Sequence, residues 1–394
     1  MTPAARIQAA IELLDAIAAA ARDQGPAADT ILARGFASRR YAGSKDRRAI
    51  RELVYDAIRL CGERPESGRA AMLALAQVRP DLRSGFDGSS YGPAAIDPAE
   101  PVASAGIAPD WLAAQLTASG IDAAEQAALL ARAPLDVRAN RLKARRDALA
   151  ARFPDAEPLA FAPDALRFPP DTRIEDTAEF QTGQIEVQDA GSQLVSEAAG
   201  AEAGATVIDL CAGAGGKTLA LGAAMANNGL LLACDIDRAR LSRLPARADR
   251  AGLSCASPML LDPGREAEQL DAFVGRADIV VIDTPCSGTG TWRRNPEARW
   301  RLTPARLDRL AATQRHLLAV GARLVRPGGT LLYVVCSLLD AEGADQIDAF
   351  LGEHRGWAAV DPELPVGEER GQGVRLTPGA HSTDGFFVAK MQAP

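Results

Sequence analysis

The sequence predicts an α/β protein whose C-terminal part is a doubly wound parallel sheet and whose N-terminal part is all helical. Two observations lead to this prediction. From residue 204 onward, short apolar runs alternate with segments of helical character, a pattern typical of parallel strands joined by helices that cover both faces. Near the N-terminus, Ile7, Ile11, Leu14 and Ile17 instead recur at three- and four-residue spacing, which indicates an amphipathic helix.

The N-terminal domain is predicted to cover residues 1–130. The stretch "DRRAIRELVYDAIRLCG" repeats the helical spacing, and two further helices are expected around "DWLAAQLTASG" and "DAAEQAALLARAP". Between them, residues 80–109 are rich in Pro, Gly and Ser and are predicted to form a long loop or linker.

Residues 131–185 are too few for a large domain and are predicted to form a small subdomain, followed by the sheet domain at 186–394. The sheet domain should contain six strands, because six short apolar runs are separated by helix-like segments. The expected strands are TVIDL (206–210), LLLACD (230–235), SPMLL (257–261), DIVVID (278–283), TLLYVVC (330–336) and GFFVAKM (385–391).

The composition is that of an ordinary globular protein, with 47% hydrophobic and 24% charged residues. Arg6, Glu12 and Asp15 interrupt the first segment where a signal peptide would need an apolar core, and no apolar run is long enough to span a membrane. We therefore expect a cytoplasmic protein with no membrane partner. The six cysteines are never closer than 21 residues and the three histidines are scattered, so we expect reduced thiols and no metal.

The net charge of −7 argues against general affinity for nucleic acid, but its distribution is uneven. Residues 34–51 hold seven cations and one anion, and "RANRLKARR" (138–146) holds five cations and no anion. Such clusters can contact phosphates, or can simply be solvated helix faces.

The predicted strands deliver glycines and carboxylates to one edge of the sheet, where ligands of doubly wound sheets bind. The first strand ends in "DLCAGAGGKTLAL", in which three glycines allow a tight turn before a helix. A carboxylate that closes the second strand suits a ribose diol, because it accepts hydrogen bonds from both hydroxyls. The residues concerned are Gly213, Gly215 and Gly216 in the turn and Asp235, Asp262 and Asp283 at the ends of strands two to four.

Three kinds of ligand could bind at this edge of the sheet. A dinucleotide would require GxGxxG, but Thr218 stands where the third glycine is needed. A P-loop would require glycine at position 211, where the sequence has Cys211. A nucleoside without phosphates, such as S-adenosylmethionine, fits better, although each acid alone can equally cap a loop or helix.

Two cysteines lie at strand ends. Cys286 follows the fourth strand in a Pro/Gly/Ser turn, and Cys336 closes the fifth. If these strands are neighbours, both sulfurs can face one pocket beside Asp283, since adjacent strands lie about 5 Å apart. Most cysteines in apolar strands are core residues. A thiol, a carboxyl group and a methyl donor together suggest methylation of a pyrimidine at C5, because a thiolate that adds to C6 makes C5 nucleophilic.

The sequence that carries these residues resembles the Sun/Nop (RsmB-like) family of RNA cytosine-C5 methyltransferases. The resemblance covers most of residues 138–390, and it implies a Rossmann-like methyltransferase domain. Its motifs are "RANRLK" (138–143), "VQDAGSQLV" (187–195), "DLCAGAGGKT" (209–218), "DIDRARLSRL" (235–244), "DTPCSGTGTWRRNP" (283–296), "LLYVVCS" (331–337) and "DGFFVAK" (384–390).

The resemblance implies a role for each matching residue. Cys336 would be the nucleophile, Cys286 would assist release of the product, and Asp283 would contact the target base. The segment "WRRNPEARWR" would contact RNA, as would the small subdomain, which should be RRM-like, and the helical domain, which is similar to NusB-like domains. The expected S-adenosylmethionine site is Cys211, Ala212, Gly213, Ala214, Gly215, Gly216, Lys217, Asp235, Asp262 and Asp283. The expected RNA contacts are Arg138, Asn140, Arg141, Lys143, Arg293 and Arg294.

The sequence departs from the family pattern at Gly213-Ala214 and Val334-Val335. Apart from these departures, the sequence as a whole predicts a monomeric methyltransferase that acts on RNA, with ribosomal RNA favoured over transfer RNA. Two alternatives remain open. They are a P-loop-like nucleotide hydrolase and a catalytically inactive RNA-binding assembly factor of the same fold.

Overall fold

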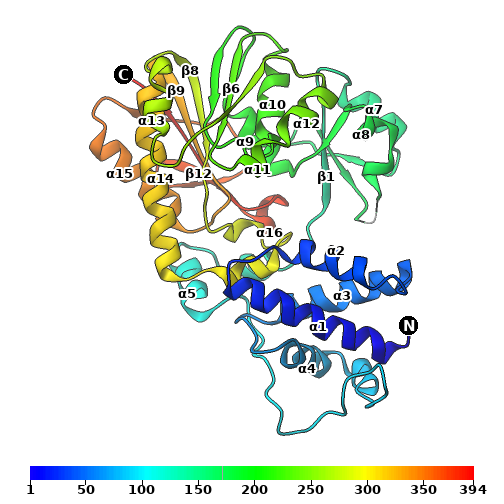
Figure 1. Ribbon diagram of the computed structural model, residues 1–394. Helices are drawn as coiled ribbons and strands as arrows, with labels where there is room; N and C mark the ends of the chain where they lie inside the picture. Colours follow the sequence, from blue (N-terminus) through cyan, green and yellow to red (C-terminus); the bar gives the residue numbers. More distant parts are fainter. Residues whose placement is uncertain (171) are drawn as a thin grey trace. The chain divides into compact units, whose positions relative to one another are not determined.

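The computed structural model describes residues 1–170 and 172–394, which form two compact units (Figure 1). The helical unit consists of Met1–Ala131 and Thr291–Pro304. The sheet unit consists of Arg132–Gly290 and Ala305–Pro394. A short segment from the middle of the C-terminal sequence therefore belongs to the helical unit.

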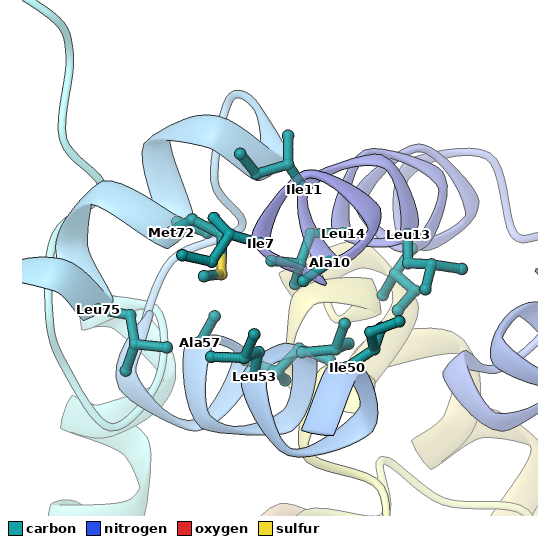
Figure 2. Packing of buried hydrophobic residues seen from close by; sticks show 14 of the residues in the cluster. Ile7, Ala10, Ile11, Leu13, Leu14, Ile50, Leu53, Ala57, Met72 and Leu75 are labelled. Atoms are coloured by element: carbon teal, nitrogen blue, oxygen red, sulfur yellow. The ribbon is translucent and has the colours of Figure 1, made fainter. Parts of the chain in front are cut away.

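The helical unit is built around helix α1, whose apolar face packs against α3 and α4 (Figure 2). Thr2 caps α1, since its hydroxyl accepts a hydrogen bond from the backbone N–H of Ala5 at 3.2 Å. Ile7, Leu14 and Ile17 are buried on this face, as their spacing predicts. The helices are α1 (Pro3–Arg22), α2 (Ala28–Ser38), α3 (Ser44–Leu60), α4 (Gly68–Val78), α5 (Asp110–Ala118) and α6 (Ala123–Ala128), with a 3₁₀ helix η1 (Pro80–Gly85).

The inserted segment Thr291–Pro304 is an integral part of the helical unit. Its 3₁₀ helix η5 (Pro296–Arg301) places Trp300 in the apolar core of that unit. The Arg299 guanidinium donates to the backbone carbonyls of Ile58 (2.6 Å) and Cys61 (2.9 Å). These carbonyls lie at the end of α3 and lack partners within the helix, so Arg299 acts as a C-terminal cap.

The sheet unit contains a nine-stranded sheet with the order β11-β12-β13-β9-β8-β5-β6-β7, to which β10 adds by pairing with β13. The pairs β7-β6, β6-β5, β5-β8 and β8-β9 are parallel, and the pairs involving β13 are antiparallel. The predicted fold class is thus confirmed, but the sheet has nine strands rather than the six expected, because β10, β11 and β12 are runs of only three or four residues. The strands are β5 (Thr206–Asp209), β6 (Leu230–Asp235), β7 (Ala256–Leu260), β8 (Ala277–Asp283), β9 (Val325–Val335), β10 (Ala358–Val360), β11 (Glu368–Arg370), β12 (Gly373–Leu376) and β13 (Phe386–Gln392).

Helices cover both faces of this sheet because alternate strand residues point to opposite sides. Ile208 packs on the face covered by α14 and α15, whereas its neighbour Val207 packs on the face covered by α9 and α10. The larger helices of the unit are α9 (Ala190–Glu197), α10 (Gly216–Ala224), α12 (Leu244–Ala251), α14 (Pro304–Leu324) and α15 (Ala344–Glu353), and the shorter ones are α11 (Arg238–Leu241), α13 (Glu266–Gln269) and α16 (Pro378–His381).

A second, four-stranded antiparallel sheet with the order β2-β3-β1-β4 precedes the large one in sequence. Its own apolar core includes Val137, Leu166 and Ile185. The sequence predicts a small subdomain at residues 131–185, and this sheet extends beyond that range to Val187 in β4. Its elements are β1 (Leu135–Ala139), α7 (Arg146–Arg152), β2 (Glu157–Pro158), β3 (Ala165–Phe168), α8 (Ala178–Gln181) and β4 (Ile185–Val187). In residues 1–170 and 172–394, no helix is long and apolar enough to cross a membrane.

Candidate active site

The glycine turn after β5 leads directly into α10. Gly213 (φ 55°) and Gly215 (φ 88°) both adopt left-handed backbone conformations that favour glycine. A Cβ atom at Gly215 would also lie 2.3 Å from Leu244 Cδ1, whereas one at Gly216 would meet nothing within 4 Å. The turn is therefore tight on its inner side and open at the start of the helix.

Asp235, at the end of β6, is buried and holds this turn in place. Its Oδ2 accepts a hydrogen bond from the backbone N–H of Gly213, and its Oδ1 accepts one from that of Asp237, each at 2.7 Å. Each carboxylate oxygen can accept a further hydrogen bond. Asp262, by contrast, follows β7 and has a side chain that is 59% exposed.

Asp209 ends β5 and is completely buried. Its Oδ2 accepts a hydrogen bond from the Thr218 hydroxyl at 2.7 Å, which ties the strand end to α10. Burial raises the pKa of Asp209 to about 6, and the nearby negative charge of Asp283 adds to the effect.

Lys217 and Asp283 form an ion pair between α10 and the end of β8. The Lys217 Nζ lies 2.6 Å from Asp283 Oδ2 and 5.5 Å from the centre of the Phe386 ring. Burial opposes the charge of Lys217, but the attraction and hydrogen bond of Asp283, together with smaller contributions that include Asp209, raise the pKa of Lys217 overall. This engagement leaves Lys217 poorly suited to the phosphate-binding role that a P-loop assigns to its lysine.

The two predicted catalytic thiols lie together. The Sγ atoms of Cys286 and Cys336 are 3.3 Å apart, a hydrogen-bonding distance for sulfur, and both residues are partly buried. They meet because β8 and β9 are parallel neighbours, with Asp283 opposite Val334. The sheet therefore places a thiol pair next to the Lys217–Asp283 ion pair.

The surroundings of Cys286 favour its protonated form. The hydrogen bond with Cys336 raises the pKa of Cys286 well above its usual value, and burial and the charges of Cys336 and Glu342 act in the same direction. Cys286 thus keeps its proton, and its S–H can donate to the sulfur of Cys336. Of the other cysteines, Cys234 is completely buried in the core, where burial raises its pKa.

Sequence reasoning missed a buried polar network beneath the thiols. Glu342, in the 3₁₀ turn η6 (Asp340–Glu342), accepts hydrogen bonds from Ser287 and Ser337. Each serine directly follows one of the two cysteines. This repeated Cys-Ser pair is a trace of the network in the sequence, but it does not indicate Glu342.

The residues predicted to bind RNA in 138–143 all have partners within the sheet unit. Arg138 is buried and donates to Gln188 Oε1 at 2.7 Å, and burial lowers its pKa to about 10. Asn140 donates to the carbonyls of Gly183 and Ala251, Arg141 pairs with Asp164 and Glu197, and Lys143 donates to the carbonyls of Thr182 and Arg250. These contacts fasten the small sheet to the rest of the unit, and the RNA-binding role stays a prediction.

Arg293 and Arg294 lie elsewhere, in the inserted segment of the helical unit. The Arg293 side chain is buried and Arg294 is partly exposed. Their predicted contact with RNA also remains untested. In the described part of the chain, no cluster of three His, Cys, Asp or Glu side chains could hold a metal ion.

Comparisons with known proteins identify the relatives of this chain. A model of the family described as 16S rRNA methyltransferase RsmB/F matches residues 199–392. The ribosomal RNA small subunit methyltransferase B of Sodalis glossinidius (strain morsitans) is 31% identical over 334 residues, which are 81% of this chain and 74% of the relative.

Two solved structures share the fold. The crystal structure of PH0851 matches 99% of both chains with a TM-score of 0.77 and 24% identity. The structure of NSun6 from Pyrococcus horikoshii with SFG matches 71% of this chain and 97% of that one, with a TM-score of 0.63 and 17% identity.

Proposed function

Because the chain belongs to the 16S rRNA methyltransferase RsmB/F family, we propose that it methylates C5 of a cytosine in RNA through a covalent bond between Cys336 and C6 of that base. Methyltransferase chemistry with S-adenosylmethionine as the donor follows from the family. The cytosine and the covalent step are our proposal, and the 3.3 Å separation of the two thiols carries it.

The residues around the glycine turn fit S-adenosylmethionine by their chemistry. The Asp235 oxygens retain acceptor capacity for the two ribose hydroxyls, and the start of α10 is open where Gly216 carries no side chain. When bound, this donor supplies an electrophilic methyl group. We assign its binding to the loop from Cys211 to Lys217 together with Asp235, Asp262 and Asp283.

We assign the two thiols different steps of the covalent reaction. The Cys336 sulfur forms a bond to C6, the C5=C6 electron pair moves onto C5, and C5 becomes nucleophilic. Once C5 is methylated, its proton passes to solvent, the electron pair of that C–H bond restores the C5=C6 double bond, and the sulfur–C6 bond breaks with its electron pair remaining on the Cys336 sulfur. Cys286 lies within hydrogen-bonding distance of that sulfur and holds a proton, so we assign it to the release step.

The two members of the Lys217–Asp283 ion pair face different reacting groups. We propose that Asp283 contacts the target base, as expected from its place at the end of β8. The ammonium group of Lys217 is one of the charges that act on Cys336, since Cys336 contributes to the raised pKa of Lys217.

We further propose that the RNA is small-subunit ribosomal RNA, which the name of the Sodalis relative gives as that protein's substrate. Residues 1–130 would act as a NusB-like RNA-binding domain and residues 131–185 as an RRM-like one. The basic cluster at 34–51 offers exposed cations for phosphate contacts, among them Arg40, Lys45 and Arg48.

The test is methylation of unmodified 16S rRNA with S-adenosylmethionine labelled in its methyl group. We expect label in 5-methylcytidine after digestion to nucleosides, and none with Cys336→Ala. Label in another nucleoside would contradict the cytosine assignment, and unchanged 5-methylcytidine with Cys336→Ala would contradict the covalent mechanism.

A further inference from the structure

Glu342 is a completely buried carboxylate that lies six residues after Cys336. Its Oε1 accepts hydrogen bonds from the backbone N–H of Ser287 (2.8 Å) and from Gln314 Nε2 (3.1 Å). Its Oε2 accepts from the hydroxyls of Ser337 (2.6 Å) and Ser287. All four donors are neutral, and no lysine or arginine of the described residues forms an ion pair with it.

A buried carboxylate without a cation is costly, and hydrogen bonds from neutral groups offset only part of that cost. Apolar side chains would stabilise the interior of the sheet unit more cheaply. The carboxylate is therefore better explained by what it connects than by a contribution to the free energy of unfolding.

Glu342 connects the two turns that carry the thiols. Ser287 follows Cys286 after β8, and Ser337 follows Cys336 after β9, so one carboxylate bridges both turns. Thr289 extends the bridge, because its Oγ1 accepts from Leu338 N at 2.9 Å and lies 3.1 Å from Ser337 Oγ. The backbone contributes a direct link as well, from Gly290 N to the carbonyl of Cys336 at 3.1 Å.

We propose that Glu342 is a positioning residue whose carboxylate fixes the Cys286 turn against the Cys336 turn and thereby sets the distance between the two sulfurs. Its catalytic consequence rests on the function proposed above. The negative charge of Glu342 also faces Cys286 and helps to raise its pKa, so the same group that positions the thiol keeps it protonated. Glu342 touches neither sulfur by hydrogen bond and acts through the serines.

The first test measures the geometry alone. In a glutathione buffer, Cys286 and Cys336 can lose two protons and two electrons to oxidised glutathione, giving one protein disulfide and two reduced glutathione molecules. The equilibrium constant of this exchange reports how closely the thiols are held. Peptide mapping of the Cys286–Cys336 disulfide measures it without RNA or a methyl donor.

We expect Glu342→Gln to lower this equilibrium constant at least fivefold at pH 7. The matched control is Glu179→Gln, because Glu179 is also buried but pairs with Arg152 in the small sheet region. The control should change the constant by less than twofold. An unchanged constant in Glu342→Gln would overturn the positioning role.

The second test measures the reaction. Glu342→Gln should lower kcat for methyl transfer at least tenfold with KM for RNA within twofold, and should accumulate a covalent protein–RNA complex because Cys286 no longer reaches the adduct. Equal kcat in Glu342→Gln and Glu179→Gln would overturn the proposal. If the wild-type protein methylates no cytosine, the proposed function is wrong. The disulfide equilibrium still tests whether Glu342 positions the two thiols.

Ser287→Ala provides a second variant in case Glu342→Gln does not fold. It removes the hydroxyl that joins Glu342 and Ser337 but keeps the backbone N–H that donates to Oε1. The disulfide constant and kcat should fall in the same direction, by a smaller factor. If both stay at wild-type values, the bridge does not position the thiols.

Discussion

The Sγ atoms of Cys286 and Cys336 lie 3.3 Å apart although fifty positions separate the two residues in sequence. Parallel pairing of β8 with β9 brings their strands together, and the buried Glu342 joins the turns that follow. A covalent bond made by one of these sulfurs would therefore form within reach of the other. The proposed division of labour between the thiols depends on this proximity.

Replacing each cysteine separately should give opposite results. Cys336→Ala should reduce methyl transfer to background with donor binding intact, because C5 is never activated. Cys286→Ala should accumulate a protein–RNA complex that survives denaturing electrophoresis, since the adduct forms but is not resolved. The double variant, which cannot form the bond, is the control. A trapped complex with Cys336→Ala instead would reverse the two roles.

Asp235→Ala should weaken S-adenosylmethionine binding by about 1.5–3 kcal/mol, the loss expected when charge-assisted hydrogen bonds are removed. The structure adds a second cause, because Asp235 also holds the backbone N–H of Gly213 in the glycine turn. Asp235→Asn, which keeps one acceptor oxygen, should lose less. Calorimetric titration measures both variants, and wild-type affinity in Asp235→Ala would remove this residue from the donor site.

Asp209 should make folding stability depend on pH. Its pKa is about 6 in the folded protein, above the usual value of 3.8, so the folded state is favoured when Asp209 is protonated. This contribution is present below about pH 4 and is lost as the pH rises through 6. The Asp209→Asn variant does not titrate there. The free energy of unfolding of Asp209→Asn, taken relative to that of the wild type, should therefore rise by about 1–3 kcal/mol from pH 4 to pH 8.

Urea unfolding at a series of pH values measures this difference. Thr218→Val is a useful comparison, because it removes the hydrogen bond to Asp209 Oδ2 but leaves the carboxyl group titratable. A difference between Asp209→Asn and wild type that does not change with pH would show that Asp209 has an ordinary pKa.

Charge reversal at Arg40 and Lys45 should weaken RNA binding and flatten its dependence on salt. Both side chains are exposed and have no ion-pair partner among residues 1–170 and 172–394, and Tyr41 between them is 72% exposed. Loss of two phosphate contacts should reduce the slope of log K against log salt by about 1.4–1.8. Arg355→Glu, an exposed cation of the sheet unit, is the matched control. An unchanged slope of log K against log salt would show that the basic cluster at 34–51 is a solvated helix face.

The sheet and the thiol pair could be predicted because both depend on short-range patterns. Apolar runs that end in Asp235 or Asp283 mark strand ends, and parallel strands bring their ends to one edge. The surroundings of charged residues could not be predicted in this way. The sequence around Arg299 and Arg138 is basic, but their guanidinium groups donate to carbonyl and amide oxygens inside the protein. A count of charges does not show which of them face water.

Glu342 was invisible for a related reason. The stretch "LLDAEGADQ" has the composition of a polar surface turn, and only the tertiary structure buries its glutamate against Ser287, which lies 55 positions earlier. Hydrogen-bond partners that lie far apart in sequence are set by the strand order. They therefore lie outside what local pattern can reveal.

The inserted segment Thr291–Pro304 has a consequence for how the protein is made. Domains usually fold as they leave the ribosome, with the N-terminal one first. Here the core of the helical unit includes Trp300, and Arg299 caps the end of α3. The core of the first helices therefore stays incomplete until residues 132–290 and then Thr291–Pro304 have been synthesised. During that interval the surface that will receive Trp300 is exposed on the nascent chain, so the N-terminal unit is among the first to begin folding and among the last to finish.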